Sequence, residues 1–288
     1  MKHLISTKEL SDEDINKLLS DAKDFKEKKE FSFKNKLIVT MFFENSTRTR
    51  SSFEIAAKRL NIQVVHLDPS KSSTKKGESL EDTFENLAAM DPDAIVIRHE
   101  DNQTPYNLSK TNKIPIINAG AGNSSHPSQA LLDLMTIKEH FTEIKGKTVG
   151  IIGDIKNSRV ASSDIELLTR MGLNIVLIAP KEYMPDSDLP QYENIKDIID
   201  ELDIIISLRA QLERHKEPIY ESNNSYCITS ELIKDKAVLI LHPGPVMRNI
   251  DITDEVLEDK RCKVLTQVNN GLYMRMAIIK MILEGKNL

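Results

Sequence analysis

Short apolar runs recur along this chain, separated by segments whose apolar residues have helical spacing. The runs lie at residues 37–42, 64–67, 94–97, 114–117, 149–152, 175–178, 204–207 and 238–241. Short, nearly continuous apolar runs are typical of strands that are buried on both faces. Strands that alternate with helices form parallel sheets with helices on both sides. The sequence therefore predicts an α/β protein built from doubly wound parallel sheets.

The helices between these strands are expected from apolar residues at positions i, i+3, i+4 and i+7. Phe53, Ala56, Ala57 and Leu60 form the clearest set. A capping-box pattern at residues 11–14 predicts the start of an N-terminal helix. Further helices are expected near residues 80–88, 131–135, 159–171 and 273–283. With 288 residues the chain is long for a single core, so we expect two domains.

Composition excludes several classes of function. The net charge of −5 argues against general affinity for nucleic acid, and no apolar run approaches the roughly 18 residues of a membrane helix. The N-terminus lacks the apolar core of a signal peptide, and Cys227 and Cys262 have no metal-binding spacing. We therefore expect a cytoplasmic protein that acts on a small acidic substrate, with no membrane and no nucleic-acid partner.

A candidate anion site follows the first predicted strand. Ser46, Thr47, Arg48, Thr49 and Arg50 lie where this strand hands over to a helix N-terminus. Free backbone N–H groups, hydroxyl groups and two guanidinium groups suit a phosphate. The alternative is an ordinary Ser/Thr helix cap followed by two solvated arginines.

Other polar residues also lie just beyond the carboxyl ends of predicted strands. They are Arg98, His126, the segment 154–159, Arg209 and the segment 242–245. Ligands of open parallel sheets bind beyond these strand ends, so we expect the scattered motifs to converge on one cleft.

Taken in order, these motifs resemble the aspartate carbamoyltransferase family, within the aspartate/ornithine carbamoyltransferase superfamily. The resemblance covers nearly the whole chain. It is carried by residues 43–50 (FENSTRTR), 75–78 (KKGE), 98–99 (RH), 126–129 (HPSQ), 153–160 (GDIKNSRV), 209–211 (RAQ) and 242–245 (HPGP).

The resemblance implies two α/β domains with the active site in the cleft between them. It assigns residues 1–130 to a carbamoyl-phosphate-binding domain and residues 131–265 to an aspartate-binding domain, with a C-terminal helix, 266–288, that packs back on the first. It also implies a homotrimer with shared active sites, no metal and no cofactor. Regulatory chains or a dihydroorotase are possible partners in this family.

The same resemblance assigns roles in the transfer of a carbamoyl group from carbamoyl phosphate to the α-amine of L-aspartate. The catalytic set is Arg48, Thr49, Arg98 and His126. The carbamoyl-phosphate set is Ser46, Thr47, Arg48, Thr49, Ser72, Lys76, Arg98, His126, Gln129, Pro243 and Gly244. The aspartate set is Lys76, Arg159, Arg209, Gln211, Gly244 and Pro245. Glu44 resembles a tether to Arg159 and Arg214, and the loop with Ser72 and Lys76 is expected to reach the neighbouring subunit.

Three alternatives remain at this stage. Ornithine carbamoyltransferases share the Ser-Thr-Arg-Thr-Arg site, but Arg209 would repel the ammonium group of ornithine, and the segment 242–245 lacks the cysteine typical of that family. A non-catalytic paralogue that acts as a scaffold would be expected to have lost some of the arginines or His126. A dinucleotide-binding dehydrogenase is disfavoured because the segment 150–154 is not a GxGxxG fingerprint.

Overall fold

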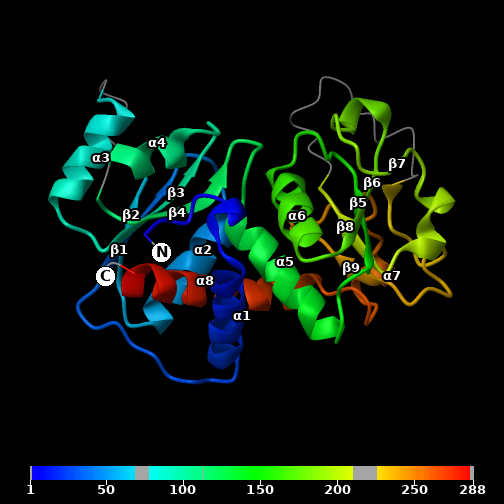
Figure 1. Ribbon diagram of the computed structural model, residues 1–288, viewed down its shortest axis with the longest axis horizontal. Helices are drawn as coiled ribbons and strands as arrows, with labels where there is room; N and C mark the ends of the chain where they lie inside the picture. The colour runs from blue at the N-terminus through cyan, green and yellow to red at the C-terminus, as the bar shows by residue number, and fades with distance from the viewer. Residues whose placement is uncertain (1, 69–77, 112, 210–225, 286–288) are drawn as a thin grey trace. The chain divides into compact units, whose positions relative to one another are not determined.

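The computed structural model describes residues 2–68, 78–111, 113–209 and 226–285. The chain divides into two compact units. Unit 1 comprises Met1–Leu132 and Asn269–Leu288, and unit 2 comprises Asp133–Val268. Each unit is built on its own parallel sheet (Figure 1). The predicted class, α/β with two doubly wound parallel sheets, is confirmed.

The sheet of unit 1 has the strand order β2-β1-β3-β4. Its strands are β1 (Leu37–Phe42), β2 (Gln63–Leu67), β3 (Ala94–His99) and β4 (Ile116–Ala121). Its helices are α1 (Asp12–Lys26), α2 (Thr47–Arg59), α3 (Leu80–Ala89), α4 (Thr104–Thr111) and the parts of α5 (Pro127–His140) and α8 (Val264–Gly285) that lie within its bounds. A short 3-10 helix, Thr7–Glu9, precedes α1.

Helices cover both faces of this sheet, as the apolar strands require. Phe84 of α3 and Leu108 of α4 pack in one core with Val39, Met41 and Ile95, which share a face of the sheet. In Figure 1, α1, α2 and α8 lie on the opposite side of the sheet from α3 and α4. Two polar contacts hold α8 on α1: Lys280 Nζ lies 2.8 Å from Asp21 Oδ1, and Lys26 Nζ lies 2.7 Å from Asn270 Oδ1.

The sheet of unit 2 has the strand order β7-β6-β5-β8-β9. Its strands are β5 (Thr148–Ile152), β6 (Asn174–Ile178), β7 (Gln191–Tyr192), β8 (Ile204–Ser207) and β9 (Leu239–Leu241). It contains α6 (Arg159–Arg170), α7 (Asp254–Leu257) and the 3-10 helices Lys181–Tyr183, Ile195–Asp197 and Ile199–Glu201. Ile152, Ile178 and Ile205 line one face of this sheet and pack against Ile199 and Val256, which belong to these short helices.

Several element boundaries differ from those expected. The fourth strand is Ile116–Ala121 and not 114–117, because Asn118 and Ala121 continue the pairing with β3, across a register shift, although the segment looks like a loop. The last helix begins at Val264, nine residues before the start that the apolar spacing predicts and two before the start that the resemblance implies. The pattern also missed α4, α7 and the two-residue edge strand β7. The predicted capping box at Ser11 and Asp14 is confirmed.

Within the described part of the chain, no helix is both long and apolar enough to cross a membrane.

Candidate functional site

Each sheet has a switch point, the place where the strand order reverses. In unit 1 the chain goes from β1 to β2 on one side and then returns to β3 on the other, so the switch point lies between β1 and β3. In unit 2 it lies between β5 and β8 for the same reason. Ligands of open parallel sheets bind beyond the strand ends at such points. The predicted site residues follow these four strands, and two further loops follow the neighbouring strands β4 and β9.

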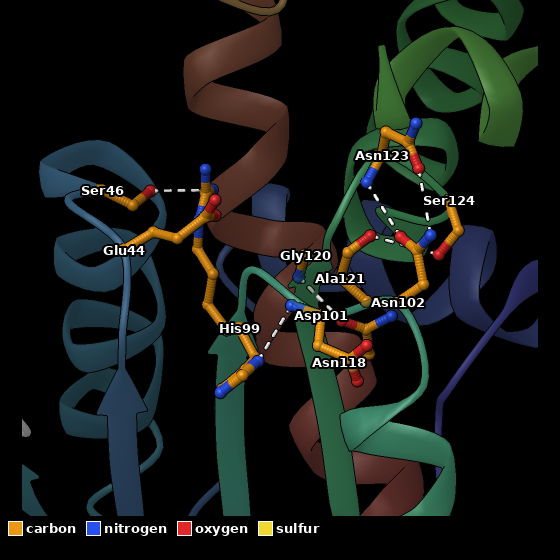
Figure 2. Close-up of polar contacts among 11 residues, drawn as sticks. Glu44, Ser46, His99, Asp101, Asn102, Asn118, Gly120, Ala121, Asn123 and Ser124 are labelled. Carbon is orange, nitrogen blue, oxygen red and sulfur yellow. Dashed lines mark hydrogen bonds and ion pairs between the residues drawn. The ribbon is translucent and has the colours of Figure 1, made fainter. Parts of the chain in front are cut away.

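Ser46 stands at the N-terminus of α2 but does not cap it. Its φ is −155° and its side chain makes no capping hydrogen bond. The hydroxyl group instead accepts a hydrogen bond of 3.0 Å from Arg98 Nη1 (Figure 2). An ordinary serine cap would bond the N–H of one of the next residues. Ser46 therefore does not act as an ordinary helix cap, although Arg48 and Arg50 are exposed as the alternative expects. Anion binding at this helix N-terminus stays a prediction.

Arg98 links the ends of β1 and β3. Phe42 and Arg98 are paired in register, and Arg98 Nε donates to Glu44 Oε2 at 3.0 Å. The Arg98 guanidinium thus contacts a carboxylate and the Ser46 hydroxyl within unit 1. The resemblance assigns Glu44 to Arg159 and Arg214. That assignment stays a prediction, and Arg214 lies outside the described residues.

The loop that delivers His126 is held by Asn118, a buried residue of β4. Asn118 Nδ2 donates to Ile5 O and to Ser125 Oγ, both at 2.8 Å. Asn118 Oδ1 accepts from Gly120 N at 2.8 Å (Figure 2). All the hydrogen-bonding groups of this amide but one lone pair are used in these bonds. His126, the residue after Ser125, is therefore held at a fixed place after the strand end.

A second asparagine supports the same loop. Asn102 Oδ1 accepts from the backbone N of Asn123 at 2.9 Å (Figure 2). Gly122 lies close to the Asn102 side chain with a φ of +45°, where a Cβ would collide with the amide. Glycine is thus required here by both space and backbone conformation.

Three of the predicted site residues of unit 1 are buried and two are exposed. Thr49, His126 and Gln129 are buried. Thr47 and Arg48 are exposed on the first turn of α2.

In unit 2, α6 begins with Arg159, directly beyond the turn that follows β5. Ser158 caps this helix, with its hydroxyl accepting from Ala161 N at 3.2 Å. Arg159 is buried, and Arg209, two residues beyond the end of β8, is partly exposed. Ile152 and Ser207 are paired in register, so these two arginines follow neighbouring strand ends.

The loop after β9 presents hydrogen-bond acceptors rather than donors. Pro243 and Pro245 have no N–H group. The N–H of His242 donates to Gln267 Oε1 at 2.9 Å, and the N–H of Gly244 donates to His242 Nδ1 at 2.8 Å. Both N–H groups of residues 242–245 therefore point at side chains. The backbone of this segment can offer a ligand only carbonyl oxygens.

His242 itself is fixed by a carboxylate. Because Nδ1 accepts from Gly244, Nε2 carries the proton and donates to Asp251 Oδ2 at 3.0 Å. The same oxygen accepts from Met247 N at 2.8 Å. Gly244 has a φ of +71°, in the left-handed region that favours glycine.

Two buried acids lie behind this loop, and the sequence reasoning missed them. Asp133 of α5 and Asp164 of α6 are fully buried. Burial, together with the charge of Asp133, raises the pKa of Asp164 well above its usual range. Gln267, also missed, donates from Nε2 to Asp133 Oδ1 at 2.6 Å. Asp133 could have been found from the sequence, because it is the one charged residue in the apolar run 130–135.

Three predicted site residues, Ser72, Lys76 and Gln211, lie outside the described residues. Among the residues that are described, no group of three or more His, Cys, Asp or Glu side chains is arranged to hold a metal ion.

Comparison with known proteins identifies the family. The carbamoyl-P binding domain of the aspartate/ornithine carbamoyltransferases matches residues 2–139, and their Asp/Orn binding domain matches residues 145–282. The chain therefore belongs to the aspartate/ornithine carbamoyltransferase family.

Within this family, three similar proteins carry the name of the aspartate enzyme. The aspartate carbamoyltransferase catalytic subunit of Sulfurovum sp. (strain NBC37-1) is 62% identical over 293 residues, with both chains fully covered. The catalytic subunit of M. jannaschii aspartate transcarbamoylase is 35% identical, with a TM-score of 0.88 and 99% of each chain covered. Aspartate transcarbamoylase from Trypanosoma cruzi, in complex with carbamoyl aspartate and phosphate, is 28% identical, with a TM-score of 0.87 over 96% of this chain and 94% of that one.

Proposed function

We propose that this chain is an aspartate carbamoyltransferase. It transfers the carbamoyl group of carbamoyl phosphate to the α-amine of L-aspartate and releases N-carbamoyl-L-aspartate and phosphate, an early step of de novo pyrimidine biosynthesis. The observation that carries the proposal is the position of the polar motifs, which follow the strands at the switch points of both sheets. The name and full-length identity of the Sulfurovum relative support aspartate as the acceptor.

The phosphate of the donor is assigned to the N-terminus of α2. Ser46, Thr47, Arg48 and Thr49 supply hydroxyl groups, a guanidinium group and helical N–H groups, all of which favour an anion. Since Ser46 does not cap the helix, these N–H groups are not satisfied by its side chain. Negative charge grows on the phosphate as it departs, so Arg48 stabilises the transition state more than the bound substrate.

Thr49, Arg98 and His126 are assigned to the carbonyl oxygen of the carbamoyl group. Attack by the amine turns this oxygen into an oxyanion, which donors held in place beforehand stabilise. Each such donor typically contributes about 3 to 4 kcal/mol. Thr49 and His126 are buried, which strengthens their interaction with a developing charge.

Gln129 and the carbonyl oxygens of Pro243 and Gly244 are assigned to the NH2 of the carbamoyl group. The segment 242–245 suits this role because its N–H groups are already used by Gln267 and His242. A group that can only donate hydrogen bonds fits a surface that can only accept them.

Aspartate is assigned to Arg159 on one carboxylate and to Arg209 and Gln211 on the other, with Lys76, Gly244 and Pro245 also in contact. Two arginines match a dicarboxylate and would repel the side-chain ammonium of ornithine. Ordering two substrates at reacting distance contributes roughly 7 to 11 kcal/mol, so positioning and electrostatics suffice for an activated donor.

The proposed assembly is a homotrimer in which Ser72 and Lys76 complete the site of a neighbouring subunit. Association with regulatory chains or a dihydroorotase, and a cytoplasmic location, likewise stay predictions.

The test is a colorimetric assay of ureido product with carbamoyl phosphate and either L-aspartate or L-ornithine. We expect carbamoyl aspartate from the first mixture and no citrulline from the second. Product with ornithine alone would establish the alternative substrate. A folded protein that forms no product with either would indicate a non-catalytic paralogue.

A further inference from the structure

Gln267 joins a buried acid, Asp133, to the backbone of the segment 242–245, the carbonyl loop. Its Oε1 accepts from His242 N at 2.9 Å, and its Nε2 donates to Asp133 Oδ1 at 2.6 Å. Gln267 is 2% exposed and Asp133 is 0% exposed. The orientation of this amide is dictated by its partners, because the backbone N–H can only donate and so must face the amide oxygen.

The charge of a neighbouring acid acts on the far side of Gln267. Burial and the charge of Asp133 raise the pKa of Asp164 well above its usual range. A charged acceptor strengthens the hydrogen bond from Gln267. Bonds in such a chain polarise one another, which strengthens the hold on His242 N.

Two side chains, Gln267 and Asp251, thus hold the carbonyl loop by hydrogen bonds. Gln267 is bonded to a carboxyl group, and Asp251 is one. Gln267, backed by Asp133, fixes the backbone of His242, while Asp251 fixes the ring of His242 and the N–H of Met247. The ring of His242 in turn accepts from Gly244 N. Moving Gln267 would free the N–H of His242, the first of the loop. The peptide group that contains this N–H could then rotate, and it precedes the carbonyl groups of Pro243 and Gly244.

We propose that Gln267 and Asp133 are positioning residues for carbamoyl phosphate: they hold the segment 242–245 so that the carbonyl oxygens of Pro243 and Gly244 face the NH2 of the carbamoyl group. This inference rests on the proposed function. Neither residue touches a substrate, and each acts through the backbone of His242.

The chemistry allows a swap that tests the bridge itself. In Gln267→Glu the new carboxylate still accepts from His242 N but cannot donate to Asp133, and it adds a second negative charge. Asp133→Asn in the same chain restores a donor on the opposite side, so both hydrogen bonds form again with one of them reversed. The double variant also has the same number of carboxylates as the wild type.

The measurement is calorimetric titration of freshly dissolved carbamoyl phosphate and, separately, of inorganic phosphate. We expect Gln267→Glu to weaken carbamoyl phosphate binding by about tenfold or more, the equivalent of one lost buried hydrogen bond. Phosphate binding should change by less than about twofold, because the phosphate is assigned to α2. The double variant should recover most of the loss.

A matched control makes the same amide-to-carboxylate change on the same helix. Asn269→Asp is two residues away at an exposed position and should bind both ligands like the wild type. Gln267→Met removes both hydrogen bonds without adding charge and should also lose carbamoyl phosphate selectively.

The inference is overturned if Gln267→Glu and Gln267→Met bind carbamoyl phosphate like the wild type. It is also overturned if the double variant does not fold, or binds no better than Gln267→Glu. These outcomes are distinct from failure of the proposed function, which is decided by ureido product from the wild type alone.

Discussion

Ser46 and Arg98 illustrate how single residues depart from their ordinary structural roles at this site. Serine at a helix start usually caps the helix, yet Ser46 accepts from Arg98 at 3.0 Å and leaves α2 uncapped by its side chain. Arg98 also holds Glu44 at 3.0 Å. The two side chains bond each other, so that they connect the segment after β1 with the end of β3. Such local inconsistencies are expected at functional sites, where they are offset elsewhere in the fold.

Replacing Arg48 by Ala should lower the turnover number by about 10² to 10³-fold, the usual cost of removing a group that stabilises charge in the transition state. Arg48→Lys should recover only part of this loss, because an ammonium cannot reproduce the planar fork of arginine. Steady-state kinetics at saturating carbamoyl phosphate are the measurement. Lys58→Ala, an exposed change on the same helix, is the control. Wild-type turnover in Arg48→Ala would remove Arg48 from the site.

Arg209→Ala should raise the apparent aspartate constant by at least about tenfold, since one carboxylate loses a charged partner. Carbamoyl phosphate should still bind with nearly unchanged affinity, because its phosphate is assigned to the other unit. Kinetics with aspartate and equilibrium binding of carbamoyl phosphate separate the two effects. Equal losses in both would contradict the division of substrates between the units.

At the scale of elements, the loops beyond the strand ends are held by buried polar side chains. Asn118 fixes the loop before His126, and Gln267 and Asp251 fix the loop after β9. Asn118 donates to the Ser125 hydroxyl, whereas Gln267 and Asp251 accept from backbone N–H groups that the loop cannot satisfy by itself. Buried side chains therefore hold these two loops on the scaffold.

Asn118→Leu should test this support for the first loop. Removing the amide leaves the buried groups of Ile5 and Gly120 without their bonds, at a cost of about 1 to 3 kcal/mol for each such group. We expect a lower melting temperature and a lower turnover number. The exposed Asn86 offers a control in the same unit, as Asn86→Leu should change neither. Full activity of Asn118→Leu would show that the loop does not need this anchor.

Two buried acids, Asp133 of α5 and Asp164 of α6, predict that the stability of the fold decreases as pH rises. The pKa of Asp164 is raised by burial and by the charge of Asp133, so the folded state holds this proton more tightly than the unfolded chain does. Stability therefore falls as pH rises above the ordinary aspartate pKa of about 4. The melting temperature of the wild type should fall more between pH 5 and pH 8 than that of Asp164→Asn. The exposed Asp188→Asn should follow the wild type, and an unchanged slope in Asp164→Asn would mean that Asp164 is ionised in the fold.

At the scale of the whole molecule, the two units repeat one design with different strand counts. In each sheet the described residues that we propose for the site follow the two strands at the switch point and one neighbouring strand. In the proposed function, unit 1 is assigned the hydroxyl groups, arginines and histidine that bind the donor, and unit 2 is assigned arginines and carbonyl oxygens. Because a transfer reaction joins two substrates, the proposed activity requires both sets.

Sharing of sites in the proposed trimer can be tested with hybrids. Lys76→Ala and Arg48→Ala should each be nearly inactive alone, whereas mixed trimers should regain activity. Some sites in a hybrid would receive a wild-type Arg48 from one chain and a wild-type Lys76 from another. Dissociation, joint reassembly and assay of verified mixed trimers are the measurement, and absence of any recovered activity would exclude sharing through Lys76.

The sequence by itself determined the parallel α/β class and the strands that carry the site, since buried strands need continuous apolar runs such as 37–42 and 204–207. It also led to the prediction of Arg48, Arg98 and His126 as site residues, because they lie in polar segments that follow such runs. Only the tertiary structure decided that Ser46 bonds Arg98 and does not cap α2. It alone revealed the hydrogen bond of 2.6 Å from Gln267 Nε2 to Asp133 Oδ1, between residues that are 134 positions apart in the sequence. The physical reason is that periodicity reports which face of an element is buried, whereas a buried polar bond depends on which distant partner shares that space.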